Sequence, residues 1–161
     1  MLLLVLSICP AARAAEIVGE VVSVADGDTL TVLDASREKH RIRLSGIDAP
    51  EKRQAYGERS KQHLAALVFR RTVRVVWEKK DRYARIVGRV LAAECEAACP
   101  YTLDVGLEQI RAGLAWHYSA YAKEQAPVQR ERYAEGERRA RERRTGLWSD
   151  AHPVAPWDFR H

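Results

Sequence analysis

Three short segments near the N-terminus have the composition of β-strands: EIVGEVVSV at residues 16–24, DTLTVLD at residues 28–34 and HRIRLS at residues 40–45. The first two are rich in Val, Leu and Ile, which favour strands, and an Asp-Gly turn signal separates them. In the third segment Ile42 and Leu44 share one face, as expected for a strand that is buried on one side. Arg41 and Arg43 share the other face. The three segments therefore predict an antiparallel meander.

The remaining hydrophobic patterns predict a helix, two strands and two further helices. In chain order they are a helix at 58–70, strands at 72–78 and 85–93, a short helix at 104–112 and a long helix at 127–144. This order favours a mainly β protein with α, a five-stranded barrel of the OB-fold type with about three packed helices. An open α+β sheet is the alternative, because the pattern does not specify barrel closure.

Length and composition indicate one folded domain. The chain has 161 residues, of which 47% are hydrophobic and 30% charged, and this composition excludes a disordered protein. Residues 16–148 form the expected domain, and residues 149–161, which contain Pro153 and Pro156, are expected to be an extended C-terminal tail. The net charge of +5 suits a polyanionic partner, but it equally suits a basic soluble protein.

The N-terminus has the form of a secretory signal. Residues 2–9 read LLLVLSIC, which is far shorter than the about 20 apolar residues that span a bilayer, so we expect no stable membrane span. Ala12-Arg13-Ala14 matches an A-x-A cleavage site, which predicts that residues 1–14 are a signal peptide and that the protein is secreted or periplasmic. A lipoprotein anchored at Cys9 and a cytosolic protein with a buried N-terminal segment are the alternatives.

Two cysteines remain after removal of the predicted signal peptide, Cys95 and Cys99. An isolated pair with no second pair and no flanking histidine gives no support for a tetrahedral zinc site. In an oxidising compartment two cysteines at this spacing predict a local disulfide, whereas in the cytosol they would be free thiols.

Acidic and basic residues converge if the meander pairs as predicted. Asp28 begins the second strand, and Asp48 and Glu51 follow the third, so the three carboxylates are expected to meet. Oxygen ligands without histidine or cysteine favour a hard cation such as Ca²⁺ or Mg²⁺. Arg43 and Arg85 would then complete a receptor for a phosphodiester, because one guanidinium group can donate two parallel hydrogen bonds to phosphate oxygens. Each residue alone suits an ordinary turn or surface charge, so the prediction depends on the combination.

Several motifs together resemble those of the thermonuclease, or staphylococcal nuclease-like, family. They are DGDT at 26–29, IRLSGIDAPE at 42–51, DRYAR at 81–85, GLAW at 113–116 and GLW at 146–148. The similarity runs in order from about Val18 to Trp148. DGDT alone is a weak signal, but its combination with the next two motifs is highly specific.

The resemblance implies an OB-fold barrel with three helices and Ca²⁺-dependent hydrolysis of phosphodiester bonds. It also implies functional residues: Asp28, Asp48 and the Ala49 carbonyl as metal ligands, Arg43, Glu51 and Arg85 as catalytic residues, and Tyr83 and Tyr121 as substrate-binding residues. Ala stands at position 49 where the family often has Thr, which does not affect a carbonyl ligand.

The predicted function is a secreted, calcium-dependent nuclease that acts on DNA and RNA with low sequence specificity. We expect it to be a monomer and to favour single-stranded substrates. The alternative is a catalytically silent OB-fold module that binds nucleic acid or protein. A degenerate module should lack some of the acids and arginines, and all of them are present here.

Overall fold

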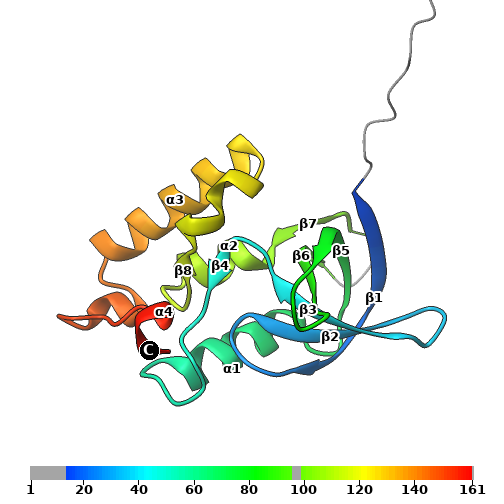
Figure 1. Cartoon of the computed structure of the whole chain (residues 1–161), viewed down its shortest axis with the longest axis horizontal. Helices are drawn as coiled ribbons and strands as arrows, with labels where there is room; N and C mark the ends of the chain where they lie inside the picture. Colours follow the sequence, from blue (N-terminus) through cyan, green and yellow to red (C-terminus); the bar gives the residue numbers. More distant parts are fainter. Residues whose placement is uncertain (1–13, 96–98, 161) are drawn as a thin grey trace, which may run out of the picture.

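The computed structural model describes residues 14–95 and 99–160, and Figure 1 shows its arrangement. The predicted signal peptide, residues 1–14, lies outside the described residues except for Ala14. Five strands build the barrel: β1 (Ala15–Val24), β2 (Thr29–Asp34), β3 (Lys39–Leu44), β5 (Thr72–Lys80) and β6 (Ile86–Ala93).

One parallel pairing closes this barrel. The strands lie in the order β3-β2-β1-β5-β6 with antiparallel neighbours, and β3 also pairs in parallel with β6, where Ile42 lies opposite Ile86. The alternation read from the third segment is correct, because Ile42 and Leu44 are buried and Arg41 is exposed. The prediction of a five-stranded OB-type barrel is confirmed, and the open sheet is excluded.

The barrel lies on the right of Figure 1, and the helices gather on its left. The three predicted helices are α1 (Gly57–Val68), α2 (Val105–Arg111) and α3 (Pro127–Glu142). α1 packs on β1 and buries Leu64 and Val68, while α2 lies between β6 and α3. Within the described ranges no helix is both long enough and apolar enough to cross a bilayer.

Several short elements were not predicted from the sequence. They are β4 (Ile47–Asp48), β7 (Tyr101–Asp104), β8 (Trp116–His117), the 3₁₀ helices η1 (Ser119–Glu124) and η2 (Gly146–Ser149), and α4 (Pro156–Phe159). β4 and β8 form a separate two-stranded sheet in which Asp48 lies opposite Trp116. This pairing fixes the backbone of a segment that the sequence predicted to be a loop.

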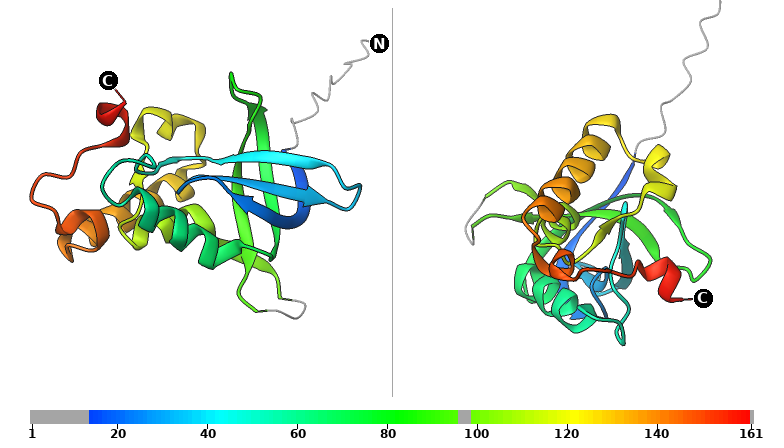
Figure 2. Two further views of the ribbon diagram at one scale, coloured as in Figure 1. Left: turned by 90° about the horizontal axis from the view of Figure 1, so that it is seen from below. Right: turned by 90° about the vertical axis from the view of Figure 1, so that its left-hand side faces the viewer.

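The C-terminal segment differs from the extended tail that we expected. It contains α4, and its Ala155 and Pro156 are buried against the body of the protein. Figure 2 shows that it runs along the helical end of the molecule, opposite the β2–β3 hairpin. Proline at the first helical position and the aromatic Trp157 explain why this short helix forms and packs.

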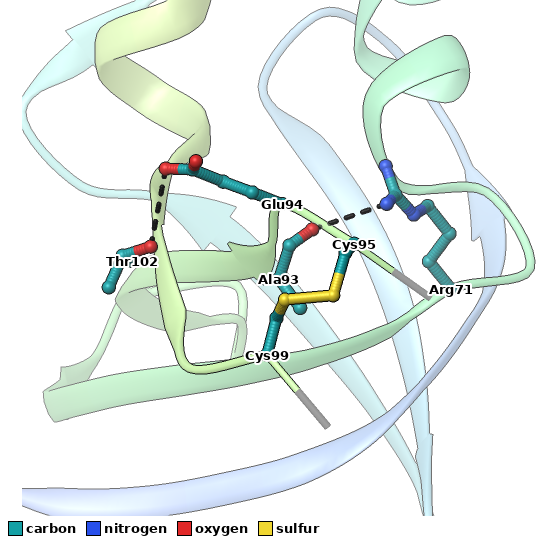
Figure 3. The surroundings of a disulfide bond; sticks show 6 residues. All are labelled: Arg71, Ala93, Glu94, Cys95, Cys99 and Thr102. Carbon is teal, nitrogen blue, oxygen red and sulfur yellow. Dashed lines mark hydrogen bonds between the residues drawn. A yellow bond between two sulfur atoms is a disulfide. The ribbon is translucent and has the colours of Figure 1, made fainter. Parts of the chain in front are cut away.

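The structure contains the disulfide between Cys95 and Cys99, with a Cα–Cα distance of 5.7 Å (Figure 3). It lies in the connection from β6 to β7, beside Ala93, whose carbonyl accepts a hydrogen bond from Arg71 Nη2 at 3.2 Å. Of the two alternatives for these cysteines, the structure has the bonded one.

A buried glutamine joins the helices to the turn before β2. Gln109 of α2 is fully buried, and its Nε2 donates to the carbonyls of Gly27 at 2.6 Å and Ser60 at 3.0 Å. Gly27 packs so closely that an added Cβ would lie 1.9 Å from Ser60 Oγ. The turn that precedes Asp28 is therefore held by α1 and α2.

We predict that Gln109→Leu destabilises the protein by about 1–3 kcal/mol, because two buried carbonyl groups lose their donor. Chemical denaturation should show a lower unfolding midpoint. Gln62→Leu on the exposed face of α1 is the matched control and should change stability little. Equal stability of the Gln109 variant and the wild type would contradict this role.

Candidate active site

Two of the three predicted acids, Asp28 and Asp48, meet where β2 begins and β3 ends, and Glu51 is connected to Asp48 through Arg160. In the antiparallel β2–β3 pair Thr29 lies opposite Arg43, and the Leu44 N–H donates to the Asp28 carbonyl at 2.8 Å. The chain then turns through Gly46 into β4, which carries Asp48. The barrel therefore brings together residues that are twenty positions apart in sequence.

The Arg43 guanidinium lies between two buried carboxylates. Its Nη1 is 3.2 Å from Asp28 Oδ2, and its Nη2 donates to Asp48 Oδ1 at 2.9 Å. Nη1 also donates to the carbonyls of Leu44 and Ile47, each at 2.9 Å. Asp28 is 6% exposed and Asp48 1%, so water solvates these two carboxylates poorly and the Arg43 guanidinium balances their negative charge.

Asp28 has two further hydrogen-bond donors. The Ala49 N–H donates to Asp28 Oδ2 at 2.9 Å, and Thr29 Oγ1 donates to Asp28 Oδ1 at 3.0 Å. The carbonyl of Ala49 is a predicted metal ligand. Ala49 is held next to Asp28 by this hydrogen bond, and it directly follows Asp48 in the sequence, so it adjoins both predicted carboxylate ligands.

Arg85 reaches the same carboxylate through Thr29. Its Nη1 donates to Thr29 Oγ1 at 3.3 Å, while its Nε donates to Asp81 Oδ2 at 2.7 Å. Asp81 also accepts from the N–H groups of Tyr83 and Arg85 at 2.9 and 3.0 Å, which shapes the turn between β5 and β6. The D-x-Y-x-R motif thus aims Arg85 at the site.

Glu51 is connected to Asp48 by a residue that the sequence did not indicate. Arg160, which follows α4, donates from Nη1 to Glu51 Oε1 at 2.7 Å. Its Nη2 donates to Asp48 Oδ2 at 2.6 Å, and its Nη1 lies 3.3 Å from Asp48 Oδ1. No motif marks Arg160, because it lies 112 positions from Asp48 in a stretch expected to be extended.

The two predicted substrate-binding tyrosines are both exposed but have different neighbours. Tyr83 is 63% exposed, and the Arg85 guanidinium lies 5.5 Å from its ring centroid. Tyr121, on η1, is 49% exposed and contacts Tyr118, with ring centroids 5.1 Å apart. Tyr83 therefore contacts a predicted site residue, whereas the ring contacts of Tyr121 are with Tyr118 and with Lys79, whose Nζ lies 5.3 Å from the ring centroid.

The acidic groups perturb one another. Burial, and next the charge of Asp28, raises the pKa of Asp26 to about 6; the Asp26 carboxylate accepts the Asp28 N–H at 3.1 Å. Burial also raises the pKa of Asp48, and the hydrogen bond from Arg160 and the charge of Arg43 oppose this rise. Asp26 belongs to the DGDT motif, and no role was predicted for it from its sequence position. Burial is thus the main cause of both shifts, and the positive groups around Asp48 act against it.

A second group of potential metal ligands lies at the far end of the β2–β3 hairpin. The ligand atoms of Asp34, Glu38 and His40 lie within 4.8 Å of one another. Asp34 accepts from the Glu38 N–H at 2.9 Å and lies 2.8 Å from His40 Nε2, contacts that stabilise the hairpin turn. Local turn geometry therefore accounts for this group.

Comparisons with known proteins agree with the geometry. Residues 41–150 match the family model described as Staphylococcal nuclease homologue. An uncharacterized endonuclease of Escherichia coli is 45% identical over 148 residues, covering 91% of this chain and 87% of that protein. Protein ParB of E. coli is 44% identical over 147 residues, covering 91% and 80%. A micrococcal nuclease of Shigella flexneri is 41% identical over 143 residues, covering 88% and 79%.

We predict that Arg43→Ala destabilises the protein by about 3–5 kcal/mol, because it leaves Asp28 and Asp48 buried without their shared cation. Urea denaturation measures the change. Arg41→Ala, on the exposed face of the same strand, removes the same charge and should have little effect. Similar unfolding midpoints for the two variants would show that the ion pairs around Arg43 do not stabilise the fold.

Proposed function

The chain belongs to the staphylococcal nuclease family, and on this premise we propose that it is an exported, Ca²⁺-dependent nuclease. Its substrates are DNA and RNA, in which it hydrolyses phosphodiester bonds with low sequence specificity. One observation carries the proposal: two buried carboxylates share Arg43, and a second arginine and a third carboxylate adjoin them. Relatives named as endonuclease and micrococcal nuclease support the reaction class.

The donor set fits a hard divalent cation. Asp28, Asp48 and the Ala49 carbonyl offer only oxygen, which Ca²⁺ prefers, and the two carboxylates share the Arg43 guanidinium. So few protein ligands predict weak binding, with a Kd of about 10⁻⁴–10⁻³ M. When bound, Ca²⁺ supplies positive charge and Lewis acidity at the scissile phosphate.

The two arginines have different roles in this proposal. Arg43 is occupied by two carboxylates and two carbonyls, so it positions the acids and balances their charge. Arg85 is held by Asp81 through Nε, which leaves its remaining guanidinium edge directed at the site to bind the phosphate. There it stabilises charge that develops during hydrolysis.

Glu51 is the proposed general base. Its side chain is 40% exposed, so water reaches it, unlike the carboxylate of Asp48, which is 1% exposed. A carboxylate in this position orients the attacking water and accepts its proton. The exposed rings of Tyr83 and Tyr121 offer surfaces for stacking unpaired bases, which supports a preference for single strands.

We predict that Glu51→Ala and Arg85→Ala each lower kcat by about 10²–10³, because each removes a group that acts on the transition state. Digestion of single-stranded DNA with excess Ca²⁺ measures the loss. Glu58→Ala and Arg82→Ala, at exposed neighbouring positions, are the charge-matched controls and should retain activity.

Excess EGTA should abolish the wild-type activity without unfolding the protein. If both active-site variants kept near wild-type rates, or if cleavage persisted in EGTA with other divalent ions excluded, the assigned site would be wrong.

Export is supported by the relation between the predicted cleavage site and the fold. β1 as described begins at Ala15, directly after the predicted cut at Ala14, so cleavage would leave all five barrel strands of the described residues intact. The disulfide between Cys95 and Cys99 suits an oxidising compartment.

We predict that the protein exported from a bacterial host begins at Ala15 and carries the disulfide, because signal cleavage and oxidation occur together outside the cytoplasm. Intact mass spectrometry, with and without reduction, measures both. A retained N-terminus, or two alkylatable thiols in the unreduced exported protein, would contradict the proposal.

A further inference from the structure

The C-terminal segment returns to the acidic site and is fixed there by packing. Trp157 stacks on Tyr118, with centroids 5.3 Å apart and planes at 21°, and meets Trp116 edge-on at 5.5 Å. Gln54 Nε2 donates to the Val154 carbonyl at 2.6 Å. These contacts hold α4 beside β4 and β8, so the residue that follows α4 is delivered to the carboxylates.

That residue is Arg160, and it takes both oxygens of Asp48. Nη2 donates to Oδ2 at 2.6 Å and Nη1 to Oδ1 at 3.3 Å, while Nη1 also donates to Glu51 at 2.7 Å. Asp48 is 1% exposed, so its partners come from the protein: Arg43 on Oδ1 and Arg160 on both oxygens. A two-donor contact between a guanidinium and a carboxylate is strong and fixes the geometry of the pair, and this one also bridges two proposed site acids.

A divalent cation and Arg160 need the same carboxylate. Calcium binds carboxylate oxygens at about 2.3–2.6 Å, which places it within a few ångströms of a guanidinium on those oxygens. The two positive groups would repel each other at low solvent exposure. Arg43 contacts Asp48 on Oδ1, whereas Arg160 covers Oδ2 at 2.6 Å and also holds Glu51. A cation that binds Asp48 through Oδ2 therefore takes the place of Arg160, while Arg43 stays.

We propose that Arg160 is a built-in competitor for the divalent cation, presented by the C-terminal segment through Trp157, and that cation binding displaces it. The inference rests on the proposed function, because it takes Asp48 as a ligand of the cation. The segment is suited to release: α4 has four residues, and its last contacts are the N–H bonds of Phe159 to Ala155 at 3.0 Å and Arg160 to Pro156 at 3.2 Å. With such competition, the apparent Kd for Ca²⁺ equals the intrinsic Kd divided by the fraction of molecules in which Arg160 is away from the site.

Calorimetric titration of the purified protein with CaCl₂, without nucleic acid, tests the inference. Arg160→Gln removes the competing charge, and Trp157→Ala loosens the segment that presents it. Both should lower the Kd for Ca²⁺, by about tenfold if Arg160 occupies the site in nine of ten molecules. Arg138→Gln is the matched control, because Arg138 also bridges two carboxylates, those of Glu135 and Glu142, on the exposed face of α3. It should leave the Kd unchanged.

Hydrogen exchange provides a second readout that does not depend on catalysis. Saturating Ca²⁺ should speed exchange at the amides of Phe159 and Arg160 in the wild type, because displacement of Arg160 releases the end of α4. Thermal unfolding of each variant checks that the barrel is intact.

The outcomes separate this inference from the proposed function. An unchanged or weaker Kd in folded Arg160→Gln, with a wild type that binds Ca²⁺ and cleaves DNA, overturns the competition but leaves the nuclease standing. A wild type and variants that neither bind Ca²⁺ nor cleave DNA overturn both. Slower exchange of the Phe159 amide with Ca²⁺ also contradicts displacement.

Discussion

Two carboxylates buried side by side require a cation between them, and the Arg43 guanidinium meets this requirement for Asp28 and Asp48. Much of the fold serves to maintain the arrangement. The β2–β3 register sets Arg43 opposite Thr29, the β4–β8 pair fixes the backbone of Asp48, and Gln109 holds the turn before Asp28. The barrel and the elements packed on it therefore set the positions of the two carboxylates, and a reaction that depends on positioned charge requires such placement.

The barrel and the proximity of its site acids to Arg43 could be predicted because both depend on local sequence patterns. The alternation of Ile42 and Leu44 indicates a strand, and pairing of that strand with the preceding one brings Arg43 and Asp48 within reach of Asp28. β4 was missed because two residues carry no periodicity. Arg160 was missed because its position depends on packing of Trp157, a contact between distant segments that no local pattern records.

The structure also separates arginines that the sequence treated as equivalent. Arg43 contacts only protein acids and carbonyls, whereas Arg85 keeps a guanidinium edge directed at the site and lies over the exposed ring of Tyr83. Arg160 is a third kind, because it contacts the acids from a segment that is held by packing and not by the barrel. Charge balance in the site thus combines fixed and releasable cations.

A crystal structure determined at saturating CaCl₂ would show whether the barrel builds a cation site around the acids paired with Arg43. We expect Ca²⁺ within about 2.3–2.6 Å of oxygens of Asp28, Asp48 and the Ala49 carbonyl. An empty site in crystals that hold Ca²⁺ elsewhere, for example at Asp34, Glu38 and His40, would contradict it.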